Sequence, residues 1–423
     1  MPVINIPETN FPRIVIVGAG FAGITLARKL VKYDFQVVLI DKNNYHQFQP
    51  LLYQVAMAGL EPSSISFPLR KIFQGDKNMH IRIGSLLKVV PENNMIETDL
   101  GICYYDHLVI AIGAKTNFHG NKDIELNAFS LKSVSESIYL RNHIIKDYEN
   151  AVVTRDYDTR QGYIDTVIVG GGPTGVEMAG ALAEMKKYIL PKDYHELDEK
   201  EVDIYLVHGG NQLLPGMSDK SGKAAEEYLV KMGVHVLKGR RVVGTDGENV
   251  SINDGTVIKA RKVIWAAGIT SNTFEGLNPE CLDKSGRILV NEYHRVKSYQ
   301  NIYALGDICA MASPGVSTPH AQVAQVAIQQ AKNLASMLIK KKDKAFVYLD
   351  KGSMATIGRN KAVVDLPFIH FHGFFAWFVW LLVHLASILG AKNKIFILIN
   401  WLWNYLTFDQ SLRLILKADR KEI

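Results

Sequence analysis

Two glycine-rich turns of the same form constrain the fold of this 423-residue chain more than any other feature. The first, Gly18 to Gly23, follows the apolar run 13–17 and leads through a helix-like stretch to a second apolar run at 36–40. The second, Gly170 to Gly175, stands in the same order of segments and leads to an apolar run at 202–207. Short apolar runs that alternate with helical stretches indicate parallel strands joined by crossover helices. We therefore predict an α/β fold with two Rossmann-like domains, in which one supersecondary unit is duplicated.

The GxGxxG spacing of these glycines predicts a dinucleotide-binding site at each turn. The first glycine permits a tight turn, the second lets the backbone approach a pyrophosphate, and the third lets the helix pack on the strand. In the first site Asp41 ends the second strand eighteen residues after Gly23, where a carboxylate accepts a hydrogen bond from a ribose hydroxyl. The candidate binding residues are Gly18, Gly20, Phe21, Ala22, Gly23, Asp41 and Lys42 in the first site, and Gly170, Gly172, Thr174 and Gly175 in the second.

A third motif assigns the two dinucleotides. Segment 301–307 places Gly306 and Asp307 directly after an apolar run and resembles the second FAD fingerprint of the two-dinucleotide-binding flavoprotein superfamily. In that superfamily the aspartate binds the ribityl chain, so the resemblance implies FAD in the first site and a nicotinamide dinucleotide in the second. A helix N-cap role for Asp307 is the alternative, but it leaves the preceding strand and glycine unexplained. Two further apolar strands that end in glycine add Gly113 to the first site and Ala267 and Gly268 to the second.

The second site departs from the usual pattern at its ribose partner. Where an NADH enzyme usually carries Glu or Asp, this chain has His208, followed by Gly209 and Gly210. Without the carboxylate the site loses an acceptor for the ribose, and it also loses the negative charge that rejects a 2′-phosphate. The choice between NADH and NADPH therefore stays open.

Three longer segments carry a resemblance to a known family. They are Asn-Tyr-His-Gln-Phe-Gln-Pro-Leu-Leu-Tyr-Gln-Val-Ala at 44–56, Gly-Pro-Thr-Gly-Val-Glu at 172–177 and Ala-Gln-Val-Ala-Ile-Gln at 324–329, the last of which fits the pattern AQxAxQ. Together with the fingerprints they make essentially the whole chain resemble type II NADH dehydrogenase, the single-subunit NADH:quinone oxidoreductase that pumps no protons. The resemblance implies non-covalent FAD, NADH as the donor with NADPH left open, and a membrane quinone of the respiratory chain as the acceptor.

The same resemblance implies roles for particular side chains. Glu177 is expected near the flavin and the nicotinamide, and its alternative is a first-turn acid that matches the helix dipole. A helix is expected over 321–338, and it would carry the glutamines of the AQxAxQ segment. The residues expected against the flavin ring and the quinone head group are Ala324, Gln325 and Gln329. Gln49 and Leu52 are expected with FAD, and the catalytic candidates are Glu177, Gln325 and Gln329.

The C-terminal segment has the composition of a membrane-attachment element. Residues 368–390 contain no Asp, Glu, Lys or Arg, a length that on paper crosses a bilayer of about 30 Å. Polar side chains on one predicted helical face instead favour helices that lie in the membrane interface. These polar residues are His370, Gly373, Trp377, His384 and Ser387, then Asn400, Asn404, Thr407 and Ser411, followed by a basic stripe of Arg413, Lys417 and Arg420. We predict interfacial attachment in preference to a single crossing.

Charge and the N-terminus limit the partners. The net charge of +6 is spread along the chain without an arginine-rich arm, so no nucleic-acid partner is expected, whereas a bilayer surface is. The first twelve residues lack the basic start and apolar run of a signal peptide, which predicts a globular part on the cytoplasmic face of a membrane. The sequence is compatible with either a monomer or a homodimer.

Other classes of protein share some of these features. A soluble flavin reductase for a ferredoxin or thiol partner has both fingerprints but needs no apolar C-terminal segment. Sulfide:quinone oxidoreductase needs a cysteine pair near the flavin, whereas Cys103, Cys281 and Cys309 are far apart in the sequence. A non-catalytic nucleotide-sensing scaffold would bind dinucleotides without electron transfer.

The predicted domains follow from these segments. They are a first part of the FAD domain at 11–115, a nicotinamide dinucleotide domain with connecting segments at 116–290, a second part of the FAD domain at 291–366 and membrane-associated helices at 367–423.

Overall fold

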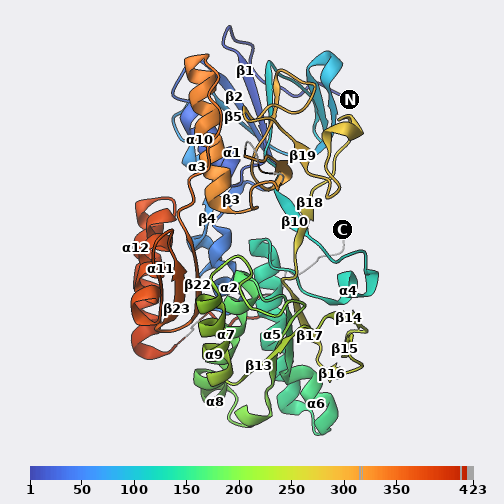
Figure 1. Ribbon diagram of the computed structural model, residues 1–423, viewed down its shortest axis with the longest axis vertical. Coiled ribbons are helices and arrows are strands. Elements are labelled where there is room, and N and C mark those ends of the chain that lie inside the picture. Colours follow the sequence, from blue (N-terminus) through green and yellow to red (C-terminus); the bar gives the residue numbers. More distant parts are fainter. Residues whose placement is uncertain (314–315, 317, 410–411, 417–423) are drawn as a thin grey trace. The chain divides into compact units, whose positions relative to one another are not determined.

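Residues 1–313, 316, 318–409 and 412–416 are described by the computed structural model, and they form two compact units (Figure 1). The first unit comprises Met1–Gln47, Phe67–Lys115 and Ile269–Asp350, and the second comprises Phe48–Ser66, Thr116–Gly268 and Lys351–Ile423. Each unit contains one of the two glycine turns. Compared with the predicted ranges, residues 48–66 and 351–366 join the second unit and residues 269–290 join the first.

A five-stranded parallel sheet forms the centre of the first unit. Its strand order is β20-β9-β1-β2-β5. The strands are β1 (Arg13–Val17), β2 (Gln36–Asp41), β5 (Met79–Ile83), β9 (His107–Ile110) and β20 (Ile302–Ala304). Because all five run the same way, their carboxyl ends lie at one edge of the sheet. The segment before Asp307 therefore ends at the same edge as the strand before Gly18.

Helices and smaller sheets complete the first unit. The helix α10 packs against α1, and β6, β7 and β8 form an antiparallel sheet. The remaining elements are α1 (Phe21–Leu30), β3 (Tyr45–Gln47), α3 (Leu69–Ile72), β6 (Leu86–Val90), η3 (Pro91–Asn93), β7 (Met95–Thr98), β8 (Gly101–Tyr104), β18 (Ile269–Ser271), η5 (Pro279–Cys281), β19 (Ile288–Leu289), η6 (Gly306–Ile308), β21 (Cys309–Ala310) and α10 (Ala324–Lys340). The chain passes between the units after Gln47, within β4 (Ser66–Pro68), within β10 (Ala114–Thr116), after Gly268 and after Asp350.

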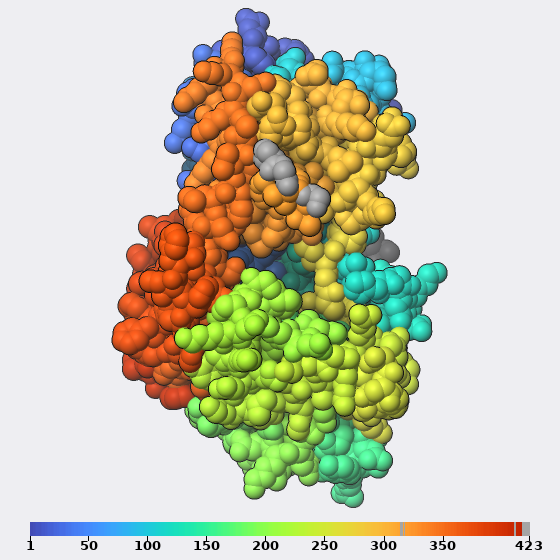
Figure 2. Space-filling model, viewed as in Figure 1, coloured from blue at the N-terminus to red at the C-terminus, as the bar shows by residue number. Residues whose placement is uncertain are grey.

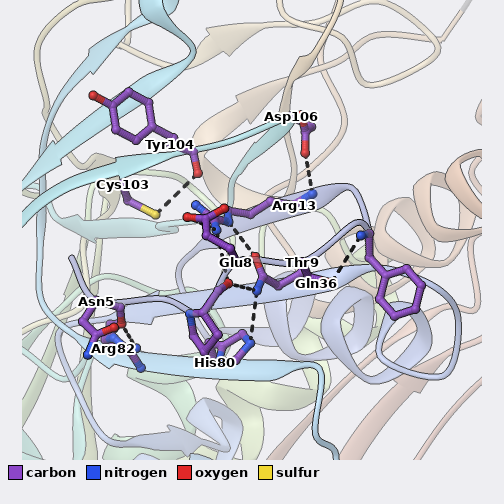
Figure 3. Close-up of polar contacts among 12 residues, drawn as sticks. Asn5, Glu8, Thr9, Arg13, Gln36, His80, Arg82, Cys103, Tyr104 and Asp106 are labelled. Carbon is purple, nitrogen blue, oxygen red and sulfur yellow. Dashed lines mark hydrogen bonds and ion pairs between the residues drawn. The ribbon is translucent and has the colours of Figure 1, made fainter. Parts of the chain in front are cut away.

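Polar contacts join the N-terminal residues to the amino ends of the strands (Figure 3). The backbone N–H of Arg13 donates to Asp106 Oδ2 at 2.6 Å, and its Nε donates to Gln36 Oε1 at 2.6 Å. Gln36 in turn donates to the Pro7 carbonyl at 2.6 Å. Because Arg13 and Gln36 begin their strands, this cluster ties down the end of the sheet opposite the carboxyl edge.

The second unit has a four-stranded parallel sheet in the order β13-β12-β11-β17. Its strands are β11 (Thr166–Val169), β12 (Ile204–His208), β13 (Val234–Lys238) and β17 (Lys262–Trp265), and β14 (Val242–Thr245), β15 (Asn249–Ile252) and β16 (Val257–Lys259) form an antiparallel sheet. The helices before the C-terminal segment are η1 (Gln49–Leu51), α2 (Leu52–Ala56), η2 (Pro62–Ser64), α4 (Lys122–Asn127), α5 (Val134–Val153), α6 (Tyr157–Ile164), α7 (Pro173–Tyr188), α8 (Leu190–Asp193), η4 (Glu199–Glu201) and α9 (Asp219–Lys231). The duplicated strand-turn-helix pattern is thus present in both units.

The C-terminal part of the second unit is a small antiparallel sheet followed by two helices. These elements are β22 (Ser353–Gly358), β23 (Lys361–Asp365), β24 (His370–His372), α11 (Phe374–Ser387) and α12 (Ala391–Thr407). Strand β22 packs against α7, and a Cβ added at Gly180 would lie 2.0 Å from the Ile357 carbonyl oxygen. Only glycine allows so close an approach at this point of α7. Figure 2 shows this segment, in red, beside the green residues of the same unit.

The predicted helical face within 368–390 is wrong in its first residues. His370 belongs to β24, and Gly373 has a φ of +94° and precedes the first turn of α11. Pairing of β24 with β23 interrupts the apolar segment, so the helix has 14 residues, Phe374–Ser387. Within the described part of the chain, no helix has the length and apolarity needed to cross a bilayer. Ser411, Lys417 and Arg420 of the predicted polar and basic faces lie outside the described residues.

Candidate active site

The first glycine turn has the backbone that its sequence predicts. Gly18 has a φ of +104°, and a Cβ there would lie 2.2 Å from the Ala111 carbonyl oxygen. A Cβ on Gly23 would lie 1.8 Å from the Gly18 carbonyl oxygen, so this helix turn also requires glycine. A Cβ on Gly20 would meet no described atom within 4 Å, which leaves open space before the N-terminus of α1. A helix N-terminus that faces open space is suited to bind a phosphate.

Asp41 holds this turn from the end of β2. Its Oδ2 accepts the Ala19 N–H at 2.6 Å, and its Oδ1 accepts the Asn43 N–H at 2.7 Å. Burial raises the pKa of Asp41, and the two backbone N–H groups partly offset the rise. The neighbouring Lys42 is exposed. The carboxylate thus stands beside the second residue of the turn, at the place where the sequence predicts a ribose partner.

Asp307 lies in η6, at the carboxyl edge of the same sheet. Gly306 has a φ of +74°, and its N–H donates to Gln330 Oε1 at 2.8 Å. The Asp307 carbonyl accepts a hydrogen bond from the Gln322 side chain at 2.8 Å. Gln330 is buried, and the sequence did not single it out as a functional residue. It acts as a positioning residue for the glycine-aspartate turn.

The glutamines of α10 have partners inside the first unit. Gln329 donates to the Leu349 carbonyl at 2.8 Å and accepts the Leu349 N–H at 3.0 Å. Gln325 donates to Asp350 Oδ1 at 3.5 Å. The helix begins at Ala324, three residues later than predicted, because Val323 before it is extended with φ −128° and ψ 152°. The structure brings Gln325 and Gln329 to residues 349–350, and their place against a flavin ring stays a prediction.

Gly113 follows β9 with a φ of +66°, at the same sheet edge as Gly18. Phe21 packs edge-on against His46, with ring centroids 5.4 Å apart, and Ala22 is buried. Gln49 and Leu52, predicted with FAD, lie in η1 and α2 of the second unit. Their expected contact with FAD stays a prediction.

The second glycine turn repeats the geometry of the first. Gly170 has a φ of +114°, and a Cβ there would lie 2.4 Å from the Ala266 carbonyl oxygen. A Cβ on Gly175 would lie 1.8 Å from the Gly170 carbonyl oxygen, whereas one on Gly172 would meet no atom of the described residues within 4 Å. Thr174 is exposed in the first turn of α7. The N-terminus of this helix therefore also faces open space.

Two more predicted residues lie at the end of β17. Gly268 has a φ of +126°, and the Ala267 carbonyl lies 3.1 Å from His119 Nε2. Gly268 follows β17, which pairs with the fingerprint strand β11, and Gly113 follows β9, which pairs with the fingerprint strand β1. The two glycines thus occupy equivalent places in the two sheets.

Glu177 is buried in α7 and faces a cavity. Its Oε1 lies 3.5 Å from the Thr356 N–H of β22. Burial raises the pKa of Glu177 to about 8, and this backbone N–H and the nearby Trp380 indole partly offset the rise. No described group forms a hydrogen bond of normal geometry with Trp380 Nε1. At neutral pH the Glu177 carboxyl therefore keeps its proton.

The cavity beside Glu177 has a volume of about 430 Å³ and lies wholly within the second unit. Its walls come from α2, α7, β22, α11 and α12, and they are mostly apolar and aromatic. Glu184 lies on the same face of α7 two turns later and also lines it. Burial raises the pKa of Glu184, while Arg359 partly offsets that rise. The sequence missed Glu184, although its seven-residue spacing from Glu177 was a usable signal.

Polar contacts connect α12 to the cavity wall formed by residues 53–59. Trp401 Nε1 donates to Gln54 Oε1 at 2.8 Å, and Gln54 donates to the Tyr53 hydroxyl at 2.8 Å. Asn404 donates to the Gly59 carbonyl at 3.1 Å. Asn404, from the predicted polar face of α12, therefore binds the protein itself through the Gly59 carbonyl. Thr407, in contrast, donates to a carbonyl of its own helix.

The three cysteines do not form a redox pair in the described part of the chain. Cys103, Cys281 and Cys309 are free thiols buried in one hydrophobic cluster of the first unit. Figure 3 shows Cys103 with its thiol directed to the Tyr104 carbonyl, at 3.7 Å. Burial raises the pKa of the Cys103 thiol to about 11 and that of Cys309 to about 12. Because the thiolate is the reactive form, these thiols are poor nucleophiles.

Comparisons with known proteins agree with this geometry. Residues 12–331 match the family model of pyridine nucleotide-disulphide oxidoreductases, and residues 351–408 match that of the NDH2 C-terminal domain. The fold and the two fingerprints thus define a pyridine nucleotide-disulphide oxidoreductase. The chain is 33% identical to the type II NADH:quinone oxidoreductase Ndh of Mycobacterium tuberculosis, over 93% of this chain and 88% of that protein. It belongs to the type II NADH:quinone oxidoreductase family, which confirms the predicted resemblance.

Two further proteins are similar over most of their length. The internal alternative NAD(P)H-ubiquinone oxidoreductase A1 of Solanum tuberosum mitochondria is 30% identical, over 92% of this chain and 86% of that protein. The structure of NDH2 from Plasmodium falciparum in complex with NADH has the same fold, with a TM-score of 0.88 and 21% identity over 96% of this chain and 100% of that one.

Proposed function

We propose that this protein transfers a hydride from NADH to FAD and then two electrons to a membrane quinone, without pumping protons. The observation that carries the proposal is the combination, in a member of this family, of two dinucleotide fingerprints with a largely apolar cavity that contains a protonated carboxyl group. When bound, the flavin accepts the hydride and passes its electrons on. The chain itself binds, orients and supplies a proton.

The first unit has the features of a non-covalent FAD site. Open space at Gly20 leaves room for a pyrophosphate before α1, and Asp41 is placed for a ribose hydroxyl. Asp307 follows β20, the edge strand of the same sheet, and the ribityl chain is expected there. We assign FAD to this unit and the nicotinamide dinucleotide to Gly170–Gly175 and His208 of the second.

The cavity of the second unit is suited to a quinone head group. Ligand pockets are typically about 300–1,000 Å³ and mostly apolar with a few polar groups, as this one is. Quinone reduction requires protons as well as electrons. Glu177 holds a proton at its carboxyl group at neutral pH, so it is the proposed proton donor. Trp380 and Trp401 supply flat apolar walls beside it.

The decisive experiment is anaerobic flavin bleaching. The purified protein should be yellow, lose its flavin absorbance on addition of NADH and regain it on addition of a quinone. A flavin that bleaches but recolours only with ferricyanide or ferredoxin would indicate a soluble-acceptor reductase. A flavin that does not bleach with NADH would exclude the enzyme and favour a nucleotide-sensing scaffold.

The C-terminal helices carry the proposed membrane surface. Their exposed large apolar side chains are Phe374, Phe375, Phe378, Leu382 and Val383 on α11, and Ile395, Phe396, Leu398, Ile399, Leu402, Trp403 and Leu406 on α12. An exposed apolar area of this kind marks an interaction site. Lys392 and Lys394 stand at the start of α12, where they would meet anionic headgroups. We propose that α11 and α12 lie in the interface on the cytoplasmic face of the membrane.

Charged substitutions on this surface are expected to release the protein from membranes. Phe375, Trp403 and Leu406 are 76%, 57% and 68% exposed and do not line the cavity. The combined change Phe375→Glu, Trp403→Glu and Leu406→Glu should leave the protein in the supernatant when anionic phospholipid vesicles are sedimented. Leu126→Glu with Val153→Glu, at 81% and 78% exposure elsewhere in the same unit, is the control. Equal release by both variants would exclude a specific role for α11 and α12.

A further inference from the structure

His208 occupies in the second fingerprint the place that Asp41 occupies in the first. Asp41 ends β2, which pairs with the fingerprint strand β1, and His208 ends β12, which pairs with the fingerprint strand β11. Asp41 Oδ2 accepts the N–H of Ala19, and His208 Nδ1 accepts the N–H of Gly171 at 3.2 Å. Ala19 and Gly171 are both the second residue of their glycine turn. The duplicated fold thus keeps the hydrogen bond but replaces a carboxylate with an imidazole.

This replacement changes the charge beside the expected ribose. Burial lowers the pKa of His208, with a partial offset from the Gln212 carbonyl, so the ring is neutral at pH 7. The residues that follow it, Gly-Gly-Asn-Gln at 209–212, include no acid. A carboxylate at this point binds the 2′-hydroxyl and repels a 2′-phosphate. The neutral imidazole of His208 provides neither the carboxylate acceptor for the 2′-hydroxyl nor the charge that repels a 2′-phosphate.

A cation lies over the residue that follows His208. The segment after β13 returns beside this loop, where Arg240 N–H donates to the His208 carbonyl at 3.1 Å. A Cβ on Gly209 would lie 3.1 Å from Arg241 Nε and 3.3 Å from its Cγ. The Arg241 side chain therefore covers Gly209, and any larger residue at 209 would push it away.

Two neighbouring cations form ion pairs, whereas Arg241 forms none within the described part of the chain. Arg240 Nε lies 3.0 Å from Asp254 Oδ2, and Lys238 Nζ lies 2.7 Å from Glu226 Oε2. Arg241 is exposed and forms no ion pair with any other residue that the structure describes. A guanidinium without an acid partner, next to the end of the second strand, is the usual arrangement for recognising a 2′-phosphate.

We infer that the second fingerprint accepts a nicotinamide dinucleotide phosphorylated on the adenosine 2′-oxygen, with Arg241 binding that phosphate and His208 admitting it. The inference rests on the proposed assignment of this fingerprint to the nicotinamide dinucleotide. It adds NADPH to NADH as an electron donor and names the two side chains that decide between them. The hydride still passes to the flavin, so no other co-reactant is required.

Anaerobic stopped-flow reduction of the holoenzyme by NADH and by NADPH tests the inference. For the wild type, kcat/KM for NADPH should lie within tenfold of that for NADH. Arg241→Gln should lower the ratio of the two values roughly tenfold to a hundredfold, the range for a lost hydrogen bond to a charged group. His208→Asp should also lower it at least tenfold, because it restores the carboxylate geometry of Asp41. Arg240→Gln is the matched control and should leave the ratio unaltered.

Binding without turnover provides a second readout. Adenosine 2′,5′-bisphosphate should compete with NADH more strongly than 5′-AMP in the wild type but not in Arg241→Gln. NADPH reduction more than a hundredfold less efficient than NADH reduction, with equal inhibition by the two nucleotides, would overturn the inference and leave the proposed function intact. An unaltered ratio in Arg241→Gln would overturn the role of Arg241. Failure of both donors to bleach the flavin would instead refute the proposed function.

Discussion

Replacing Glu177 with Gln is expected to slow quinone reduction about a hundredfold, the lower range for loss of a general acid. The amide keeps the size of the side chain but has no proton to give. Single-turnover reoxidation of the reduced flavin by quinone measures this step, and reduction of the flavin by NADH measures the other half-reaction. We expect the reoxidation to slow far more than the reduction. Equal slowing of both, or of neither, would contradict the proposed role.

Glu184→Gln is the matched control for this experiment. Glu184 lines the same cavity from the same helix, but its Oε1 accepts the Arg359 N–H, a contact that holds it to the start of the turn after β22. We expect its substitution to slow quinone reduction less than about threefold. A hundredfold effect there as well would show that the cavity needs both carboxyl groups.

The pH dependence gives a further check on Glu177. Because its pKa is raised to about 8, the carboxyl is protonated at pH 7 and loses its proton as the pH rises through 8. Quinone reduction by the wild type should therefore fall above pH 8, and the Glu177→Gln profile should be flat there. Between pH 4.5 and about 8 the folded state retains a proton on Glu177 that the unfolded state, with a pKa of 4.5, has released. The contribution of this group to the unfolding free energy is therefore complete below pH 4.5 and is lost as the pH rises to about 8.

Gly18→Ala is expected to abolish FAD retention and to destabilise the first unit. The φ of +104° at Gly18 is strained for alanine, and the new methyl would lie 2.2 Å from the carbonyl oxygen of Ala111, which directly follows the neighbouring strand β9. Backbone strain of this kind costs about 1–3 kcal/mol, and the displaced strand adds to it. Flavin absorbance after gel filtration and the thermal unfolding midpoint measure the two effects. A yellow protein with wild-type thermal stability would refute the prediction.

Gly20→Ala separates FAD binding from folding. The backbone there is extended, with φ −70° and ψ −167°, and a Cβ would meet no described atom within 4 Å. The protein should therefore unfold at the wild-type temperature yet lose flavin more readily, since the methyl occupies the space reserved for the pyrophosphate. Unchanged flavin retention would place the pyrophosphate elsewhere.

The features that the sequence predicted correctly are local ones. Gly18 and Gly170 lie in turns that only glycine permits, and each turn joins a buried strand to a helix within a few residues. Asp41 and His208 end their strands because the apolar runs end there. Their hydrogen bonds to the turns could be expected, since parallel strands bring these ends to one edge.

The features that the sequence missed depend on packing. The helix predicted from Ala321 begins at Ala324, because the residues before it are extended and Gln322 donates to the Asp307 carbonyl instead of entering a helical turn. His370 pairs in β24 rather than lying on a helix. Apolar composition and a 3.6-residue period cannot separate such a strand from the first turn of a helix.

The cavity could not be predicted from the sequence, because its walls come from segments far apart in the chain. Its walls come from residues 53–59, 177–189, 356–359 and 374–409. Because Gly180 has no Cβ, β22 can approach α7 closely at this wall. The Gly-Pro-Thr-Gly-Val-Glu segment indicates Glu177, but the raised pKa of this residue follows from burial by segments almost 180 residues away in the chain.

The chain's sequence alone thus determined the two glycine turns, the strand-end residues and the family, because each depends on residues close together in the chain. Tertiary structure alone decided which carboxyl groups are buried, which glutamine supports the Gly306 turn and which arginine beside His208 lacks an acid partner among the described residues. Burial and ion pairing depend on neighbours in space, and those neighbours are distant in the sequence.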